Sequence, residues 1–250
     1  MALLSQVAYP IIWWALLLLL DTINFRKWGS SLIQSNFKFF ASIIIPFSAF
    51  YWLYFEFVNY VFPQWNYIGN ISSVVFNTFF SFASFATVIP AIVELFWLFN
   101  GPEFKLGITK YKSAIFFLGL IFTILPFFSG NFWLNQTVWI APFLLLAPFL
   151  DYEKWKPKTF WLIALVGLLS GIFWESLNFW VDGKWQYVIL DSAPHLFEMP
   201  IYGYLGFIPF ALSTLAAYLF AKFFFRPSLW LSGLLYVLAL GASYLFALSL

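Results

Sequence analysis

Eight apolar segments, each long enough to cross a membrane as a helix, occupy most of this chain. A spanning helix needs roughly 20 mainly apolar residues. Hydrophobic residues make up 63% of the 250 positions and charged residues only 9%, whereas soluble domains are about 25% charged. We therefore predict an all-α integral membrane protein with about eight transmembrane helices, over residues 5–22, 38–61, 72–99, 112–130, 133–150, 159–180, 197–221 and 228–249.

Lysine and arginine alternate along the chain in step with these segments. Lys184 falls in an even-numbered loop, and the other eleven cations fall in odd-numbered loops. Positively charged loops remain cytoplasmic, so both termini are expected on the non-cytoplasmic side, and we expect a bacterial inner membrane as the host. A wrong number of helices would destroy the alternation. The cations of the odd loops are Arg26, Lys27, Lys38, Lys105, Lys110, Lys112, Lys154, Lys156, Lys158, Lys222 and Arg226.

Residue types that are rare or missing exclude several kinds of site. The chain has no cysteine, which excludes disulfides, thiolate metal sites and iron–sulfur clusters. His195 is its single histidine, so a histidine-rich metal site and bis-histidine haem ligation within the chain are excluded. A net charge of +2 without a basic run gives no sign of nucleic-acid binding. We expect no cofactor, and the partners left open are membrane lipid, a hydrophobic isoprenoid or pigment, and other membrane proteins.

A short motif occurs twice, near the ends of the second and sixth apolar segments. Residues 55–67 and 174–187 both read aromatic-Glu-x-x-Asn-aromatic, followed by Trp-x-Tyr. The two segments are four helices apart, so both copies point the same way. This predicts two parallel four-helix repeats, residues 1–130 and 131–250, within a single membrane domain. The alternative is a chance match in a chain that is 25% aromatic.

Each copy of the motif contains a carboxylate and an amide three residues apart. On a helix this spacing puts Glu56 and Asn59, and likewise Glu175 and Asn178, on one face. A carboxylate inside a membrane marks a candidate functional site, because a desolvated carboxyl can hold a proton and act as a general acid. The alternative is an interfacial carboxylate solvated by lipid headgroups. The candidate substrate-binding residues are Trp174 and four aromatic residues that could equally belong to an interfacial belt, namely Trp65, Tyr67, Trp185 and Tyr187.

The loop after the second copy holds most of the charge on the predicted external face. His195 and Glu198 have no counterpart after the first copy, so the second half is the better candidate for a site. Either residue could act as a base that complements Glu175. The structural alternatives are a hydrogen-bonded loop histidine, an acid at a helix start, and a solvated loop for Asp182, Lys184 and Asp191. A metal could also be bound by Glu175, Asn178, His195 and Glu198, but no spacing typical of a metal site is present, and we expect none.

The motifs resemble those of the lycopene cyclase domain family and the related carotenoid hydratases. The resemblance rests on Phe55-Glu56 with Trp65, Tyr67, Pro90 and Glu94, and on Trp174-Glu175 with Trp185, Tyr187 and Pro209. It implies a small, cofactor-free membrane enzyme built from repeated modules. The tandem acids of the family pattern, Pro-x-Glu-Glu, are absent from both halves, so a shared reaction does not follow from the resemblance.

Three functions remain open. The first is a cofactor-independent acid–base enzyme, a cyclase, hydratase or isomerase acting on an isoprenoid or carotenoid lipid. Glu175 would be its acid and Asn178 would orient that acid, with Glu56 and Asn59 in support. The second is a non-catalytic subunit of a membrane complex that binds pigment, quinone or lipid. The third is a small repeat-built transporter. An enzyme requires a lipid-accessible cavity that the carboxylates reach, a scaffold requires none, and a transporter requires an aqueous path.

Overall fold

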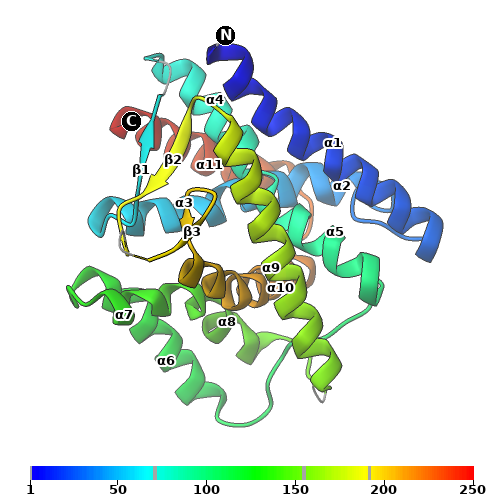
Figure 1. Ribbon diagram of the computed structural model, residues 1–250. Coiled ribbons are helices and arrows are strands. Elements are labelled where there is room, and N and C mark those ends of the chain that lie inside the picture. The colour runs from blue at the N-terminus through cyan, green and yellow to red at the C-terminus, as the bar shows by residue number, and fades with distance from the viewer. Residues whose placement is uncertain (1, 70–71, 154–155, 191–192) are drawn as a thin grey trace.

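A bundle of helices with a short pair of strands at one end makes up the computed structural model of this chain (Figure 1). It describes residues 2–69, 72–153, 156–190 and 193–250, so Lys154 and Asp191, both named above, lie outside the described residues. Among the described residues, six helical segments are long and apolar enough to cross a membrane. The chain is therefore a mainly helical, polytopic membrane protein. The six segments are Val7–Trp28, Phe37–Val61, Val74–Asn100, Pro157–Trp180, Ile201–Phe224 and Leu229–Ser249.

The first half of the chain supplies three of these segments. The first lies in α1 (Ala2–Trp28), and the second joins α2 (Phe37–Phe39), the π-helical turn η1 (Phe40–Ile44) and α3 (Ile45–Val61). The third joins α4 (Val74–Phe85) to α5 (Val88–Asn100). Asn36 and Ser73 begin the second and third segments, because each side chain accepts a hydrogen bond from the backbone N–H three residues on.

The next two predicted spans differ from the other six. The fourth is α6 (Lys112–Ile124) with the 3-10 turn η2 (Leu125–Phe127), an apolar helix shorter than the six. The fifth is α7 (Phe132–Asn135) with η3 (Gln136–Trp139), followed after a bend of 50° by α8 (Ala141–Leu146) with η4 (Ala147–Phe149). Pro142 starts α8, and proline interrupts helices because it lacks an N–H and fixes φ. The number of eight spans thus stays a prediction.

The second half supplies the remaining long helices. They are α9 (Pro157–Trp180), α10 (Phe207–Phe224), which the 3-10 turn η5 (Ile201–Gly206) precedes, and α11 (Leu229–Ser249). α10 packs against α9, α8 and α5, and α11 packs against α3 and α4. Gly167 and Gly171 of α9 permit its close approach to α10, since a Cβ at either position would lie 2.4 Å from an atom of Phe207. The core therefore joins both halves of the chain.

The structure contains two small strand pairs, of which β1, β2 and β3 lie in predicted loops and β4 lies at the start of the predicted span 197–221. β1 (Trp65–Ile68) pairs antiparallel with β2 (Lys184–Tyr187), with Trp65 opposite Tyr187 and Tyr67 opposite Trp185. β3 (His195–Leu196) pairs with β4 (Met199–Pro200). β1 and β2 come from different halves of the chain and contain the Trp-x-Tyr ends of the two copies of the motif. A two-stranded ribbon is marginal on its own, so this one needs support from the helix ends.

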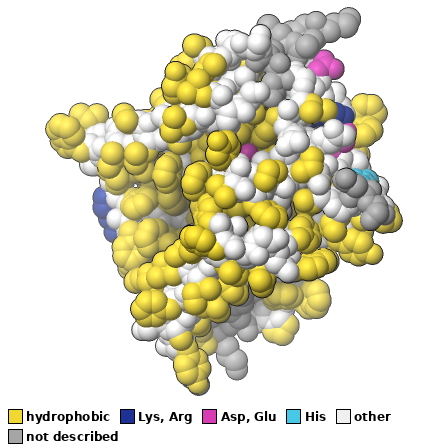
Figure 2. Space-filling view, turned by 90° about the vertical axis from the view of Figure 1, so that its left-hand side faces the viewer, with side chains coloured by type: hydrophobic (Ala, Val, Ile, Leu, Met, Phe, Trp, Pro, Cys, Tyr) yellow, Lys and Arg dark blue, Asp and Glu magenta, His cyan; other side chains and the backbone are white. Residues whose placement is uncertain are grey.

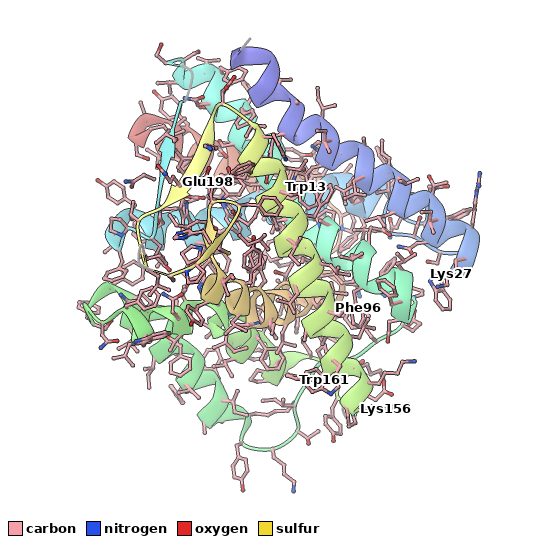
Figure 3. All side chains as sticks on the ribbon, in the orientation of Figure 1. Trp13, Lys27, Phe96, Lys156, Trp161 and Glu198 are labelled. Atoms are coloured by element: carbon pink, nitrogen blue, oxygen red, sulfur yellow. The ribbon has the colours of Figure 1, made fainter. Side chains whose placement is uncertain are left out.

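The surface agrees with a membrane location. Large apolar side chains are widely exposed, among them Phe128 at 81% and Trp230 at 90%, which is the arrangement that lipid favours over water. Figure 2 shows that hydrophobic side chains dominate the left-hand side of Figure 1. Figure 3 places Lys27 and Lys156 on one side of the molecule and Glu198 on the other, beside the strands.

Candidate functional site

The Asn of each motif copy anchors a strand to the end of its own helix. Asn178 Nδ2 donates to Trp185 O at 2.8 Å, and Asn178 Oδ1 accepts from Trp185 N at 3.0 Å. Asn59 makes the same two bonds with Trp65, at 2.9 and 3.1 Å. An amide side chain suits this position because it offers a donor and an acceptor together. The bonds explain why the motif pairs an Asn near a helix end with a Trp in the strand that follows.

Glu175 lies one helical turn before Asn178 and accepts hydrogen bonds from the strand. Its Oε1 accepts from Tyr187 OH at 2.9 Å and from Trp185 Nε1 at 3.2 Å. The side chain is 1% exposed, and its Oε2 has no hydrogen-bond partner within the described part of the chain. One carboxyl oxygen is therefore fixed by the strand, while the hydrogen-bonding capacity of the other is unused among the described residues.

Glu56 has nearly the same surroundings in the first copy. Its Oε1 accepts from Tyr67 OH at 2.5 Å and from Trp52 Nε1 at 2.7 Å. Trp52 belongs to the same helix, whereas the indole that contacts Glu175 comes from the strand. Oε2 of Glu56 also has no partner among the described residues. The two carboxyl groups are thus held in matching ways at the ends of α3 and α9.

The phenols that bind these carboxyl groups remain protonated. Burial is the main cause that raises the pKa of Tyr67 and of Tyr187 well above 10, and the adjacent Glu raises it further in each case. Each tyrosine therefore keeps the proton that it donates to Oε1 across the ordinary pH range.

An aromatic cavity of about 360 Å³ lies between the strand pair and the helices, and Glu175 lines it. This volume is near the lower end of the range for small-molecule sites, about 300–1,000 Å³. Half of the described lining residues are aromatic, and Glu175 is the one charged residue among them. Trp52 and Trp174 stack at 5.6 Å between ring centroids where the two motif helices meet. The cavity therefore combines a large apolar surface with a single carboxyl group.

Several lining residues are themselves exposed on the apolar surface. Trp133 of α7 is 68% exposed, and Tyr202 and Leu205 of η5 are 58% and 62% exposed. The lining of the cavity therefore includes residues of α7 and η5 that are exposed on the apolar surface.

The structure gathers most of the predicted site residues around this cavity. Trp65, Tyr67, Trp174, Trp185 and Tyr187 all line it together with Glu175. Asn59, Asn178 and Glu56 are absent from the described lining and lie directly behind these residues, which they hold by the bonds given above.

His195 and Glu198 lie outside the described lining. His195 is exposed on β3, opposite Pro200. Glu198 forms an ion pair with Lys184, and its side chain is 15% exposed. Glu198 is nevertheless near enough to Glu175 for an electrostatic interaction, so a role for Glu198 or His195 as the complementary base stays a prediction. Opposite charges within the same loop were the sequence signal for this ion pair.

Other lining residues carry no motif that the sequence could reveal. Tyr9 of α1 is 5% exposed, and its ring meets that of Trp185 edge to face at 5.7 Å. Gln136 of η3 donates to Gln64 Oε1 at 3.0 Å and accepts from Trp139 Nε1 at 3.0 Å. These residues come from segments distant in sequence, so only the fold identifies them.

A further buried carboxyl group, that of Glu94, lies in a separate polar cluster. Its Oε1 accepts from Leu32 N at 2.8 Å, and Asn24 Nδ2 donates to its Oε2 and to its backbone oxygen. Asp21 accepts from Ile33 N at 2.6 Å in the same region. These bonds attach the loop after α1 to α5, which gives Glu94 a structural role.

Comparison of the chain with protein-family models, with curated proteins and with solved structures gives no match in any of the three. The resemblance to the lycopene cyclase domain family accordingly stays a prediction. No group of three or more His, Cys, Asp or Glu among the described residues could hold a metal ion. The aromatic cavity and Glu175 are therefore the features of the described residues that bear on function.

Proposed function

We propose that this protein is a cofactor-independent acid–base enzyme, a cyclase, hydratase or isomerase, acting on an unsaturated isoprenoid-type lipid. The observation that carries the proposal is the carboxyl group of Glu175 in an aromatic cavity, with Oε2 unpartnered among the described residues. Glu175 is the proposed acid. Tyr187 and Trp185 fix its orientation through Oε1, and Asn178 fixes the strand that carries them.

The simplest reaction of this kind requires no other reagent. The Glu175 carboxyl gives its proton to a carbon–carbon double bond, which forms a new C–H bond and leaves a carbocation on the lipid. The cation then loses a proton from a neighbouring carbon to the Glu175 carboxylate, either directly or after a second double bond has attacked it. The product is an isomer or a ring, and the enzyme regains its proton. Addition of water to the cation would give a hydrated product instead.

The walls of the cavity suit a cationic intermediate. Aromatic faces attract cations, with indole the strongest. Trp52, Trp174 and Trp185 all line the cavity beside Glu175. A mainly apolar lining also limits the access of water to a carbocation until a product has formed. The size of the cavity favours a short isoprenoid, or one end of a longer polyene, over a complete carotenoid.

The proposal includes the arrangement in the membrane. Eight spans in two parallel four-helix repeats, with both termini on the non-cytoplasmic side, would put the cavity near the external ends of α3 and α9. The position of Lys27 and Lys156 on the side opposite Glu198 in Figure 3 supports this orientation. The matching bonds of the two motif copies support a duplication.

A second candidate is a non-catalytic subunit that binds a pigment, quinone or lipid. Glu56 favours it, because Glu56 makes a matching tyrosine bond without lining the cavity. Anchoring a strand is therefore sufficient reason for the motif, and Glu175 could do the same with no chemistry. A transporter gains no support from a cavity whose lining is mainly apolar.

Glu175→Gln and Glu56→Gln form a matched pair for testing catalysis. Gln keeps an oxygen that can accept from the tyrosine but has no acidic proton, so both variants are expected to fold. Wild type and variants would be purified from the same lipid-rich host, and their bound lipids would be extracted and identified by mass spectrometry. We expect wild type and Glu56→Gln to carry the converted lipid and Glu175→Gln to carry its precursor. The same lipid in the same chemical state on all three would exclude catalysis and leave the binding function.

A further inference from the structure

One face of α4 brings hydroxyl and amide groups to the cavity. Asn77, Ser81 and Ser84 are spaced by four and three residues, which places them on one side of the helix. They are 7%, 3% and 6% exposed, and all three line the cavity. We call them the polar stripe of α4. In a membrane bundle, buried polar groups are expensive unless they serve a partner.

Ser84 is the member of the polar stripe that points to a ligand. Ser81 Oγ donates to Thr78 O at 3.1 Å within the same helix. Ser84 Oγ is fully enclosed and has no hydrogen-bond partner among the described residues. A buried hydroxyl without a partner is destabilising, so it calls for an explanation such as a bound molecule that completes its hydrogen bonding. Ser84 is also one of the residues that line the cavity, half of whose described lining residues are aromatic.

The matching stretch of the second half lacks these serine and asparagine side chains. An ungapped alignment of Glu56 with Glu175 places Phe80, Ser81 and Ser84 at the positions of Met199, Pro200 and Gly203, and all six residues line the cavity. The polar stripe therefore belongs to the first half of the chain, and the lining carboxyl group belongs to the second half. A ligand that satisfies both would be chemically different at its two ends.

The charge of the cavity limits what that ligand can carry. No Lys or Arg occurs among the described lining residues, and the nearby Lys184 is engaged by Glu198. An anionic head such as a diphosphate would be buried beside Glu175 without a counter-ion, which is highly unfavourable. The polar end of the ligand must therefore be neutral.

We infer that the cavity binds a neutral, oxygen-bearing unsaturated lipid, with its hydroxyl or carbonyl oxygen at Ser84 and its hydrocarbon part towards Glu175. This inference rests on the proposed function for the role of Glu175. Ser84 Oγ can donate to a carbonyl oxygen or accept from a hydroxyl group. The polar stripe would then set which double bond reaches the carboxyl group, and it would select against pure hydrocarbons.

The test compares three probes that share one isoprenoid skeleton: farnesene, farnesol and farnesyl diphosphate. Binding to the full-length protein in lipid nanodiscs would be followed by quenching of tryptophan fluorescence, since several tryptophans line the cavity. We expect farnesol to bind about fivefold more tightly than farnesene, which is the ratio that one net hydrogen bond supplies. Farnesyl diphosphate should bind no more tightly than farnesene.

Ser84→Ala should remove the preference for the alcohol and leave the affinity for farnesene unchanged. Ser170→Ala is the matched control, because Ser170 is a buried serine of α9 that bonds to its own helix at Val166 O and is absent from the described lining. The inference would be overturned if wild type bound farnesol and farnesene equally, or if Ser84→Ala kept the preference for farnesol. It would also be overturned if farnesyl diphosphate bound most tightly, or if none of the probes bound.

The same measurements separate this inference from the proposed function. Glu175→Gln should still prefer farnesol, because the oxygen site lies on α4. A preference for the alcohol without any conversion of lipid by wild type would sustain the inference and refute catalysis. Conversion of lipid by wild type without a preference for the alcohol would support the proposed function and refute this inference.

Discussion

Removing the Asn178 side chain tests whether the motif anchors the strand that walls the cavity. Asn178→Ala deletes the donor to Trp185 O and the acceptor from Trp185 N, at 2.8 and 3.0 Å. The amide is fully buried, so water does not replace it without local opening. Both backbone groups of Trp185 that faced Asn178 lose this partner.

The expected cost follows from these two groups. Each buried polar group left without a partner costs about 1–3 kcal/mol, which bounds the effect at about 2–6 kcal/mol. Hydrogen bonds between helices in membrane proteins contribute less than this upper bound, typically about 0.6–2 kcal/mol. The strand also lies near the end of its helix, where water can reach the backbone groups of Trp185 after a small movement. We therefore expect Asn178→Ala to lower the free energy of unfolding by about 2 kcal/mol.

The assay is thermal and denaturant unfolding of the purified protein in one detergent, with Asn100→Ala as the control. Asn100 makes only long bonds of 3.4 Å near the end of α5, so its replacement should change stability by less than about 0.5 kcal/mol. Asn59→Ala should resemble Asn178→Ala, because Asn59 bonds to Trp65 in the same way. Equal stability of the Asn178 and Asn100 variants would show that the strand does not depend on the motif.

Two further predictions concern the strand pair. Gly69→Ala should destabilise the protein more than Gly130→Ala. Both glycines have positive φ, but of the two only Gly69 would place a Cβ against backbone, at 2.3 Å from Asp182 O. Unfolding of the two variants compares their free energies of unfolding. Tyr67 and Tyr187 have a folded pKa raised above 10, so their contribution to stability is complete below pH 10 and declines as pH rises further. Alkaline titration of tyrosinate absorbance should show a phase above pH 10 to which both phenols contribute, and replacing both with Phe should reduce the amplitude of that phase.

The positions of the helices follow from the sequence because they depend on local properties. Apolar length identifies a membrane helix without knowledge of its neighbours, and the six long helices lie where the sequence predicts apolar segments. The spacing of Glu175 and Asn178 also predicts that they share one side of a helix. The bend before Pro142 was not predicted, since proline is often tolerated within membrane helices.

The cavity could be predicted only in part. The motif identified Glu175 and the aromatic residues after it, because they recur in order along the chain. Tyr9, Gln136 and the polar stripe of α4 reach the cavity through packing between distant segments, which leaves no local pattern. His195 was singled out because it is the one histidine in the chain, although chemical rarity does not specify position in space.

The strand register explains why the motif occurs twice. Alternate residues of a strand face the same side, so Trp65 and Tyr67 of β1 share one face, as do Trp185 and Tyr187 of β2. Pairing Trp65 with Tyr187 and Tyr67 with Trp185 joins the four rings into one surface, and all four line the cavity. A ribbon requires two strands, and one copy of the motif supplies one strand with its anchoring Asn. The two copies of the motif thus supply both strands of a wall that a single copy could not form, while the chemistry that we propose needs the carboxyl group of one copy only.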